Sequence, residues 1–315
     1  MSKKYNVKAI FTPPHPLNTA VLFLVFNRLD TTKQVFEAIR EAKPPRLYIA
    51  ADGARESKSG EDEKVKEVRE YILSHIDWKC EIETLFREQN YGCKMAVSGA
   101  IDWFFKNEEM GIILEDDCLP SQSFFWFCEE LLERYKDDMR IGQISGDNFQ
   151  KGIKRGNADY YFSIYNHIWG WASWANRWKN YDVNLSQIKN IKFIDEIFRD
   201  KKDKQYWKDI FNTMKQQKID TWDYQWTFCL WNKKQLTILP NVNLIENVGF
   251  GVDATHTIGE SEFANLKVHE MVIVNHPTEI LQDYVADEFT SKLMFRKKNI
   301  ILRIIDKISK IKNEL

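Results

Sequence analysis

The chain has 315 residues, of which 43% are hydrophobic and 29% charged, a composition typical of a folded globular protein. Its 45 Lys and Arg residues nearly balance its 46 Asp and Glu residues, which argues against a non-specific nucleic-acid binder. The longest apolar run, Ala20–Phe26, is far shorter than the roughly 20 residues that span a bilayer. No apolar segment of the kind found in signal peptides lies between Met1 and Pro16, so we expect a cytoplasmic protein.

The first half of the chain alternates between strand and helix patterns. Strands are predicted at Ala20–Phe26, Arg46–Ala51, Glu81–Phe86 and Gly111–Leu114, and helices at about 31–42, Asp62–Leu73, Met95–Phe105 and Ser121–Tyr135. Thr31 or Thr32 is expected to cap the first helix, and Pro44-Pro45 to end it. This alternation predicts right-handed βαβ units and an α/β fold with a mostly parallel sheet.

Beyond about residue 150 the alternation stops, and tryptophans become frequent. Helices are predicted near Lys204–Gln217 and Trp222–Trp231. No Pro- or Ser-rich linker separates the two halves, so we expect them to share an interface. Between Lys292 and Leu315 there are eight Lys and Arg residues and two acids, which gives this segment a net charge of +6. Isoleucines recur in it at helical spacing. This basic amphipathic pattern is compatible with a membrane-surface anchor, a partner-docking helix or a helix packed on its own domain.

The five cysteines are scattered and never spaced as C-x-x-C, which favours reduced thiols over a disulfide framework or a zinc site. Eleven tryptophans are unusually many, and they either fill a large core or line a site that stacks flat ligands. Among Trp169, Trp171, Trp174 and Trp178 the spacing follows neither strand nor helix, so we expect some to pack in the core and one or two to form a sugar platform.

The strongest chemical signal is the acidic triplet Glu115-Asp116-Asp117 at the end of a buried strand. Open α/β sheets bind ligands at that edge, and three adjacent anions are costly unless a cation neutralises them. Oxygen ligands favour Mg²⁺ or Mn²⁺ bridged to phosphates. Arg28 and Asp52 follow the ends of two other strands, where they are suited to hold a phosphate and a base or ribose. Neither G-x-G-x-x-G nor a P-loop follows the first strand.

In this order the motifs resemble nucleotide-sugar glycosyltransferases of the GT-A fold, closest to the N-acetylglucosaminyltransferase I type and its bacterial relatives in surface-polysaccharide synthesis. The resemblance covers about residues 19–256. It rests on the segments Phe23–Arg28, Asp52-Gly53, Asn90–Lys94, Leu114–Asp117, Phe124-Phe125, Ile144–Asn148, Gly170-Trp171, Trp222-Asp223, Gly249–Gly251 and His256. It implies a nucleotide-sugar-binding half at 18–150 and an acceptor-binding half at 151–285. The sequence pattern adds a tail at 1–17 and a basic amphipathic helix at 286–315.

Position by position, the resemblance implies roles for particular residues. Donor binding would fall to Arg28, Asp52, Lys94, Ser98, Glu115 and Asp116, metal binding to Asp117 and His256, and base catalysis to Asp223. The acceptor side would include Asp147, Trp171 and Trp222. The segment Trp222–Trp226 has one acid where the vertebrate type has two adjacent, so acceptor specificity does not transfer.

The expected function is therefore metal-dependent transfer of a sugar, from a UDP-sugar in particular, to a glycan or lipid-linked acceptor with inversion. Two alternatives stay open. A sugar-nucleotide pyrophosphorylase would carry a Gly-rich loop after the first strand, whereas Arg28 is followed by Leu29-Asp30-Thr31. A non-catalytic carbohydrate-binding protein is suggested by the tryptophans alone. No nucleic-acid partner is expected, and the basic C-terminus predicts peripheral contact with a membrane surface.

Overall fold

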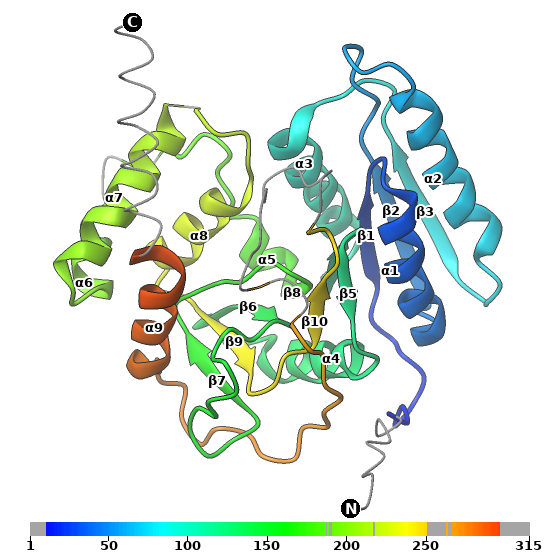
Figure 1. The fold of residues 1–315 in the computed structure, drawn as a ribbon. Coiled ribbons are helices and arrows are strands. Elements are labelled where there is room, and N and C mark those ends of the chain that lie inside the picture. Colours follow the sequence, from blue (N-terminus) through cyan, green and yellow to red (C-terminus); the bar gives the residue numbers. More distant parts are fainter. Residues whose placement is uncertain are drawn as a thin grey trace, which may run out of the picture.

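The structure is a computed structural model that describes residues 11–186, 188, 191–216, 218–250, 263 and 266–296 (Figure 1). Within these residues, eight strands form the main sheet in the order β3-β2-β1-β4-β8-β6-β9-β7. Four of its pairs are parallel (β1–β2, β2–β3, β1–β4 and β6–β9), and three are antiparallel (β4–β8, β6–β8 and β7–β9). A separate antiparallel pair joins β5 to β10. The expected α/β fold with a mostly parallel sheet is confirmed.

The strands are β1 (Val21–Val25), β2 (Arg46–Ala51), β3 (Glu81–Phe86), β4 (Met110–Glu115), β5 (Cys118–Pro120), β6 (Ile141–Ser145), β7 (Tyr160–Ser163), β8 (Trp171–Trp174), β9 (Leu236–Pro240) and β10 (Ile245–Asn247). The helices are α1 (Leu29–Ala42), α2 (Glu61–His75), α3 (Gly92–Asn107), α4 (Ser123–Tyr135), α5 (Ala175–Trp178), α6 (Phe193–Ile197), α7 (Lys201–Lys215), α8 (Asp223–Asn232) and α9 (Tyr284–Thr290), which a π-helical turn, η1 (Ser291–Arg296), continues.

Strand β1 is buried along its whole length because helices cover both faces of the sheet. Successive side chains of a strand point to opposite faces, so Val21, Phe23 and Val25 join one core while Leu22 and Leu24 join the other. The first core contains the apolar faces of α1, α2 and α4, and the second contains those of α3, α7 and α8. The result is a three-layer arrangement of helices, sheet and helices.

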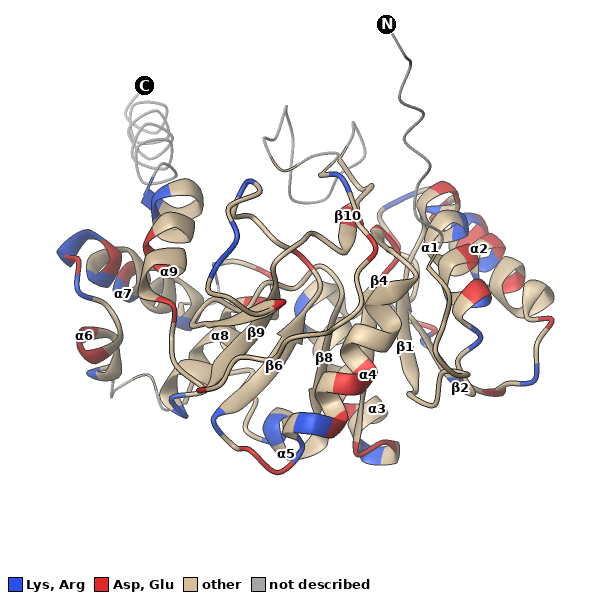
Figure 2. Ribbon diagram, turned by 90° about the horizontal axis from the view of Figure 1, so that it is seen from below, with Lys and Arg blue, Asp and Glu red and all other residues tan. Residues whose placement is uncertain are grey.

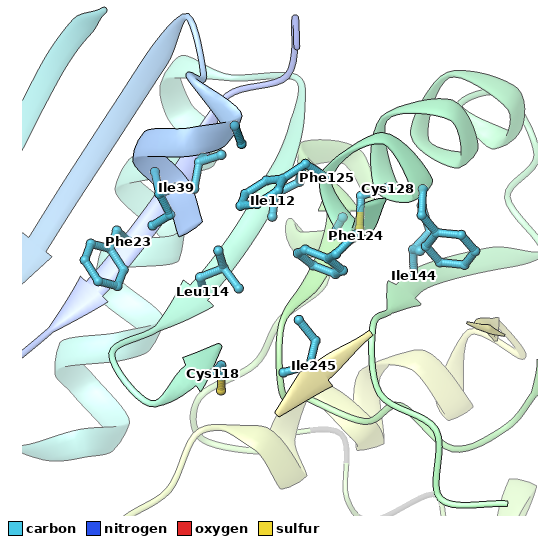
Figure 3. Close-up of a cluster of buried hydrophobic side chains, with 14 of the residues drawn as sticks. Phe23, Ile39, Ile112, Leu114, Cys118, Phe124, Phe125, Cys128, Ile144 and Ile245 are labelled. Atoms are coloured by element: carbon cyan, nitrogen blue, oxygen red, sulfur yellow. The ribbon is translucent and has the colours of Figure 1, made fainter. Parts of the chain in front are cut away.

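Figure 3 shows part of a buried hydrophobic cluster that contains the residues on either side of the acidic triplet. Leu114 on β4 and Cys118 on β5 bracket the triplet, and both are almost fully buried. Ile245 on β10 and Phe124 on α4 belong to the same cluster and are 0% exposed. Because the residues on both sides of the triplet are anchored in the core, its backbone is held at one place on the sheet edge.

Most elements predicted for the first half are confirmed. The strands at Arg46–Ala51 and Glu81–Phe86 have the predicted bounds, and Pro44-Pro45 follows the end of α1. The predicted threonine cap is wrong. Arg28 occupies the N-cap position, and the hydroxyls of Thr31 and Thr32 inside the first turn donate back to its carbonyl oxygen.

The second half adds strands that its sequence did not predict. β7, β8 and β9 join the same sheet as β1–β4, so a continuous sheet links the two halves. Residues 286–296, the described start of the expected basic helix, pack on the domain. The Phe295 ring stacks on Tyr165 with centroids 5.1 Å apart, and Arg296 donates two hydrogen bonds to Asp203. Residues 297–315 lie outside the described residues, and in the described part no helix is both long and apolar enough to cross a bilayer.

Candidate functional site

Parallel pairing brings the ends of β1, β2 and β4 to one edge of the sheet. Val25 pairs with Ala51 and Leu24 with Glu115, so the residues that follow these positions emerge side by side. Arg28, Asp52 and the acidic triplet therefore gather at this edge, as the sequence predicted. The charge view shows acidic residues at the end of β4, close to β10 (Figure 2).

Arg28 and two acids of the triplet form an ion-paired cluster. The Arg28 Nη2 atom donates to Asp116 Oδ1 at 2.5 Å and to Asp117 Oδ2 at 2.9 Å. Burial opposes the charge on Arg28, but the two carboxylates outweigh it and raise the pKa of the guanidinium. Burial raises the pKa of Asp116 to about 6, against the opposing effect of Arg28. The second oxygen of Asp116, Oδ2, is buried and has no hydrogen-bond partner among the described residues.

Glu115 and Asp223 lie close enough for their charges to interact. Burial, followed by the charges of Asp117, Asp116 and Asp223, raises the pKa of Glu115 to about 8. Asp223 is the first residue of α8 and is partly exposed, and the Thr221 hydroxyl donates a hydrogen bond to its carboxylate. The structure thus places an acid of the second half near the acidic triplet of the first half, although the two are far apart in the sequence.

The segment that follows β10 covers the acidic triplet. The Val248 N–H donates to the Asp117 carbonyl oxygen at 2.8 Å. A Cβ atom on Gly249 would lie 2.3 Å from Asp117 Oδ2 and 2.9 Å from Arg28 Nη1, so only glycine permits this close approach. His256, the second expected metal ligand, lies a few residues further on and is outside the described residues.

The N-terminus of α3 is closed by two carboxylates. Asp52 accepts the N–H groups of Tyr91 and Gly92 at 3.0–3.1 Å. Asp220, from the loop before α8, accepts those of Cys93 at 3.0 Å and Lys94 at 3.1 Å, which places Lys94 at this edge through its backbone. The N–H groups that a helix leaves unpaired at its start are thereby satisfied.

The Cys93 thiol lies among the acids of both halves. Burial, followed by the charges of Glu115, Asp220, Asp223 and Asp52, raises its pKa to about 12. The thiol is therefore protonated at neutral pH and is no nucleophile. All five cysteines of the chain are free, as predicted.

Four of the expected site residues are buried. Ser98 is 4% exposed and donates to the Lys94 carbonyl oxygen within α3. The rings of Trp171 and Trp222 are at most 2% exposed and stack on each other with centroids 5.6 Å apart. Asp147 is 1% exposed, and neither of its carboxyl oxygens has a hydrogen-bond partner among the described residues. Burial raises the pKa of its carboxyl group well above the usual value.

Most of the tryptophans serve the core. The eight buried ones are Trp126, Trp171, Trp174, Trp178, Trp207, Trp222, Trp226 and Trp231. Trp169 differs, because it is partly exposed and lies beside the covering segment, with its ring centroid 5.7 Å from that of Phe250. Phe149 contacts it from another side at 5.1 Å. Of the four clustered tryptophans, Trp169 is thus the one available to contact a sugar.

The donor set suits a divalent cation that shares its coordination with a substrate. Asp117 is 19% exposed, and the unpartnered oxygen of Asp116 is a further carboxylate ligand nearby. No group of three or more His, Cys, Asp or Glu side chains could hold a metal within the described ranges. The residues therefore fit Mg²⁺ or Mn²⁺ only if phosphate oxygens and waters complete the shell, which is how Mg²⁺ commonly binds in nucleotide sites.

A groove of about 1040 Å³ lies elsewhere, at the edge where β2 and β4 begin. Its charged lining is mainly acidic, and Arg46 within it is already paired with Glu108 at 2.6 Å. An acidic groove without a cluster of oxygen ligands repels a nucleotide diphosphate. We therefore assign the candidate site to the opposite edge.

No protein-family model and no curated protein matches this chain. Solved structures with a likeness include HddC from Yersinia pseudotuberculosis, with 9% identity, a TM-score of 0.31, and 50% of this chain and 77% of that one covered. S. aureus TarS 1-349 has 8% identity, a TM-score of 0.39, and 73% and 59% coverage. The galactosyltransferase LgtC, in complex with donor and acceptor sugar analogs, has 10% identity, a TM-score of 0.32, and 59% and 68% coverage. Likenesses this distant carry no argument about activity, so the site is interpreted from its own geometry.

The sequence did not single out Asp220, and it did not predict the contact of Phe250 with Trp169, both of which the structure adds to this edge. Asp220 precedes Asp223 by three residues, but nothing local marks it as a partner of α3. Phe250 belongs to the Gly249–Gly251 motif, which gave no reason to pair it with Trp169. Both contacts are between segments far apart in the chain, so only the fold reveals them.

Proposed function

We propose that this chain is a metal-dependent glycosyltransferase that moves a sugar from a UDP-sugar to a glycan or lipid-linked acceptor, with inversion at the anomeric carbon. The observation that carries this proposal is the ion-paired cluster of Arg28, Asp116 and Asp117 at the carboxyl edge of the sheet, with Asp223 near enough for its charge to raise the pKa of Glu115. A donor-binding cluster and an acid available as a base are both needed for sugar transfer, and the charges of the two interact here. Surface-polysaccharide synthesis is the setting that the resemblance implies.

Donor binding is assigned to the cluster around Arg28. The Arg28 guanidinium pairs with two carboxylates and is positioned to exchange one of them for a phosphate. Carboxylates and phosphates both offer oxygen atoms that accept the N–H groups of a guanidinium. Asp117 and Asp116 would hold the divalent ion, with His256 as a further expected ligand. When bound, the ion supplies the charge that neutralises the departing diphosphate. Asp52 and Lys94 would lie near the nucleotide, and Glu115 near the ribose and sugar.

Proton removal is assigned to Asp223. In a single displacement the acceptor hydroxyl attacks the anomeric carbon from the face opposite the diphosphate, and a carboxylate takes the hydroxyl proton. Such general base catalysis contributes roughly 10²–10⁴-fold. The Thr221 hydroxyl holds one carboxylate oxygen of Asp223 in place, which fixes the orientation of the base. Trp169 and Phe250 would contact the acceptor or donor sugar through their rings.

The basic C-terminal segment is proposed to bring the enzyme to anionic membrane surfaces, where lipid-linked acceptors reside. Each Lys or Arg near such a surface contributes about 1 kcal/mol. Since residues up to Arg296 are packed on α7, the segment that contacts the membrane would begin after them.

The test combines binding and product analysis. We expect calorimetry to detect tight UDP binding with Mn²⁺ and weak binding after EDTA, and a screen of UDP-sugars to give UDP release. An α-linked donor should give a β-linked product by NMR. Equal UDP affinity with and without EDTA would overturn the metal assignment, and an α-linked product would overturn single displacement. Consumption of a nucleoside triphosphate with a sugar 1-phosphate would favour the pyrophosphorylase, and glycan binding without nucleotide would favour the binding protein.

A further inference from the structure

An acidic side chain, Asp220, connects the loop before α8 to the first half of the chain. The two carboxylate oxygens of Asp220 accept the N–H groups of Cys93 at 3.0 Å and Lys94 at 3.1 Å, at the start of α3. These bonds join residues 126 and 127 positions apart in the sequence. They cross from the second half, which supplies the proposed base, to the helix beside the proposed donor cluster.

The backbone of α3 is shaped to receive this side chain. Gly92, the first residue of the helix, has φ +76°, a conformation that L side chains rarely adopt. A Cβ atom there would lie 2.8 Å from Asp220 Oδ2. Glycine is thus required both by the backbone conformation and by the close approach of the carboxylate. A helix of 16 residues also presents partial positive charge at this end, which favours the anion.

Only two residues separate Asp220 from Asp223, and both are constrained. The Thr221 hydroxyl donates to the Asp223 carboxylate, and the Trp222 ring is buried against Trp171. The Trp222 carbonyl oxygen accepts from the Tyr181 hydroxyl at 3.2 Å. The chain from Asp220 to Asp223 is therefore fixed at one end on α3 and in the middle in the core, which leaves little freedom for the carboxylate of Asp223.

We propose that Asp220 is a positioning residue: by binding the start of α3 it sets the distance between Asp223 and the donor cluster at Glu115–Asp117. This inference rests on the proposed function, since it concerns the base of that reaction. Asp220 itself is exposed and touches neither donor nor acceptor in this role. Transfer requires the base to be held near its productive position, and a displacement of about 1 Å can cost roughly 10²-fold in rate.

The experiment compares Asp220→Ala, Asp220→Asn and Asp283→Ala with the wild type. Asp283 is the matched control, because it also accepts two helix N–H groups, at 3.1 Å and 2.9 Å, but within its own helix α9. The assays are UDP release from whichever of UDP-glucose, UDP-galactose and UDP-N-acetylglucosamine the wild type consumes, UDP affinity with Mn²⁺, melting temperature, and hydrogen exchange of peptides covering 91–98 and 220–226.

We expect Asp220→Ala to lower kcat by roughly 10²-fold with UDP affinity within about twofold of wild type, and to speed exchange in both peptides. Asp220→Asn, whose amide oxygen can still accept an N–H, should recover most of kcat. Asp283→Ala should lower the melting temperature and leave kcat unchanged.

Unchanged exchange at 220–226 in Asp220→Ala would overturn the proposal, as would a kcat no lower than that of Asp283→Ala. A wild type that consumes no UDP-sugar would instead overturn the proposed function, while faster exchange at 220–226 would still establish the link between Asp220 and the segment that holds Asp223.

Discussion

The Nη2 atom of Arg28 and the Oδ2 atom of Asp117 lie 2.9 Å apart, although 89 positions separate the two residues in the sequence. The same atom also donates to Asp116, so Arg28 is the positive charge that pairs with two of the three acids of the triplet.

The first prediction follows from this pair. Arg28→Gln should destabilise the chain in EDTA by about 1–3 kcal/mol, because partly buried carboxylates lose a charged partner. Mn²⁺ should recover much of that loss, since the ion replaces the missing positive charge. Thermal denaturation with EDTA and with Mn²⁺, for the variant and the wild type, measures both effects. If Mn²⁺ raises the melting temperature of the two proteins equally, Arg28 and the cation do not share this site.

The second prediction concerns the base. Asp223→Asn preserves the shape of the side chain and removes its basicity, so UDP and Mn²⁺ affinity should be unchanged while transfer falls by at least ~10²-fold. Calorimetry and initial rates measure the two properties separately. Lost nucleotide binding would place Asp223 in the donor pocket instead. Asp147→Asn is the matched comparison, because this acid is buried, and the variant should keep its activity.

A third prediction concerns stability and pH. Asp287 is 5% exposed, and burial raises its pKa from 3.8 to about 7. The folded state therefore holds a proton that the unfolded state loses, so this group stabilises the fold at low pH and its contribution is lost as pH rises towards 7.

Asp287→Asn should remove this loss of stability at high pH, because asparagine does not ionise. Its amide oxygen can accept the N–H groups of Ile164 and Gln282, while its NH₂ group can donate to the Ser163 hydroxyl. We expect the variant to match wild type at about pH 5 and to exceed it by on the order of 1–3 kcal/mol at about pH 8. Urea denaturation at both pH values gives the comparison. A variant that is less stable at high pH would show that the charged carboxylate is favoured.

The fourth prediction separates Trp169 from the buried tryptophans. Trp169→Ala should raise the KM for a sugar substrate by roughly tenfold, since a stacked ring contributes about 1 kcal/mol or more, with little effect on melting temperature. Trp171→Ala should instead unfold or strongly destabilise the chain, because its ring is fully buried. If Trp169→Ala has the same melting temperature and the same KM as the wild type, the Trp169 ring has no role in sugar binding.

The fifth prediction fixes where the C-terminus can be cut. A chain ending at Arg296 keeps the contacts of Phe295 and Arg296 and should leave membranes for the soluble fraction while still turning over a soluble acceptor. A chain ending at Thr290 loses those contacts, which exposes Tyr165 and removes both Ser291 and Arg296 from Asp203, and should be less stable. Fractionation and melting curves test this. An unchanged distribution for the longer chain would locate membrane contact elsewhere.

The sequence was informative where local patterns decide structure. The buried strand before Glu115 and the alternation around it predicted the fold and the edge at which Arg28, Asp52 and the triplet meet. It was uninformative for β7, β8 and β9, which are only four or five residues long. β7 and β8 also contain aromatic residues, which occur in helices as well as in strands. For the same reason the burial of Trp171 and Trp222 could not be foreseen, because burial depends on contacts between α8 and a strand that the pattern did not reveal.

Asp52 and Asp220, whose carboxylates bind the start of α3, affect which anions the protein can bind there. With Asp52 and Asp220 in place, the positive end of this helix is neutralised and presents no free N–H group from Tyr91, Gly92, Cys93 or Lys94 to a phosphate. Inorganic phosphate and cation-free nucleotides therefore gain nothing there. Retention of the proposed donor, and release of the spent nucleotide, would follow the availability of the divalent ion rather than the concentration of phosphate in the cell.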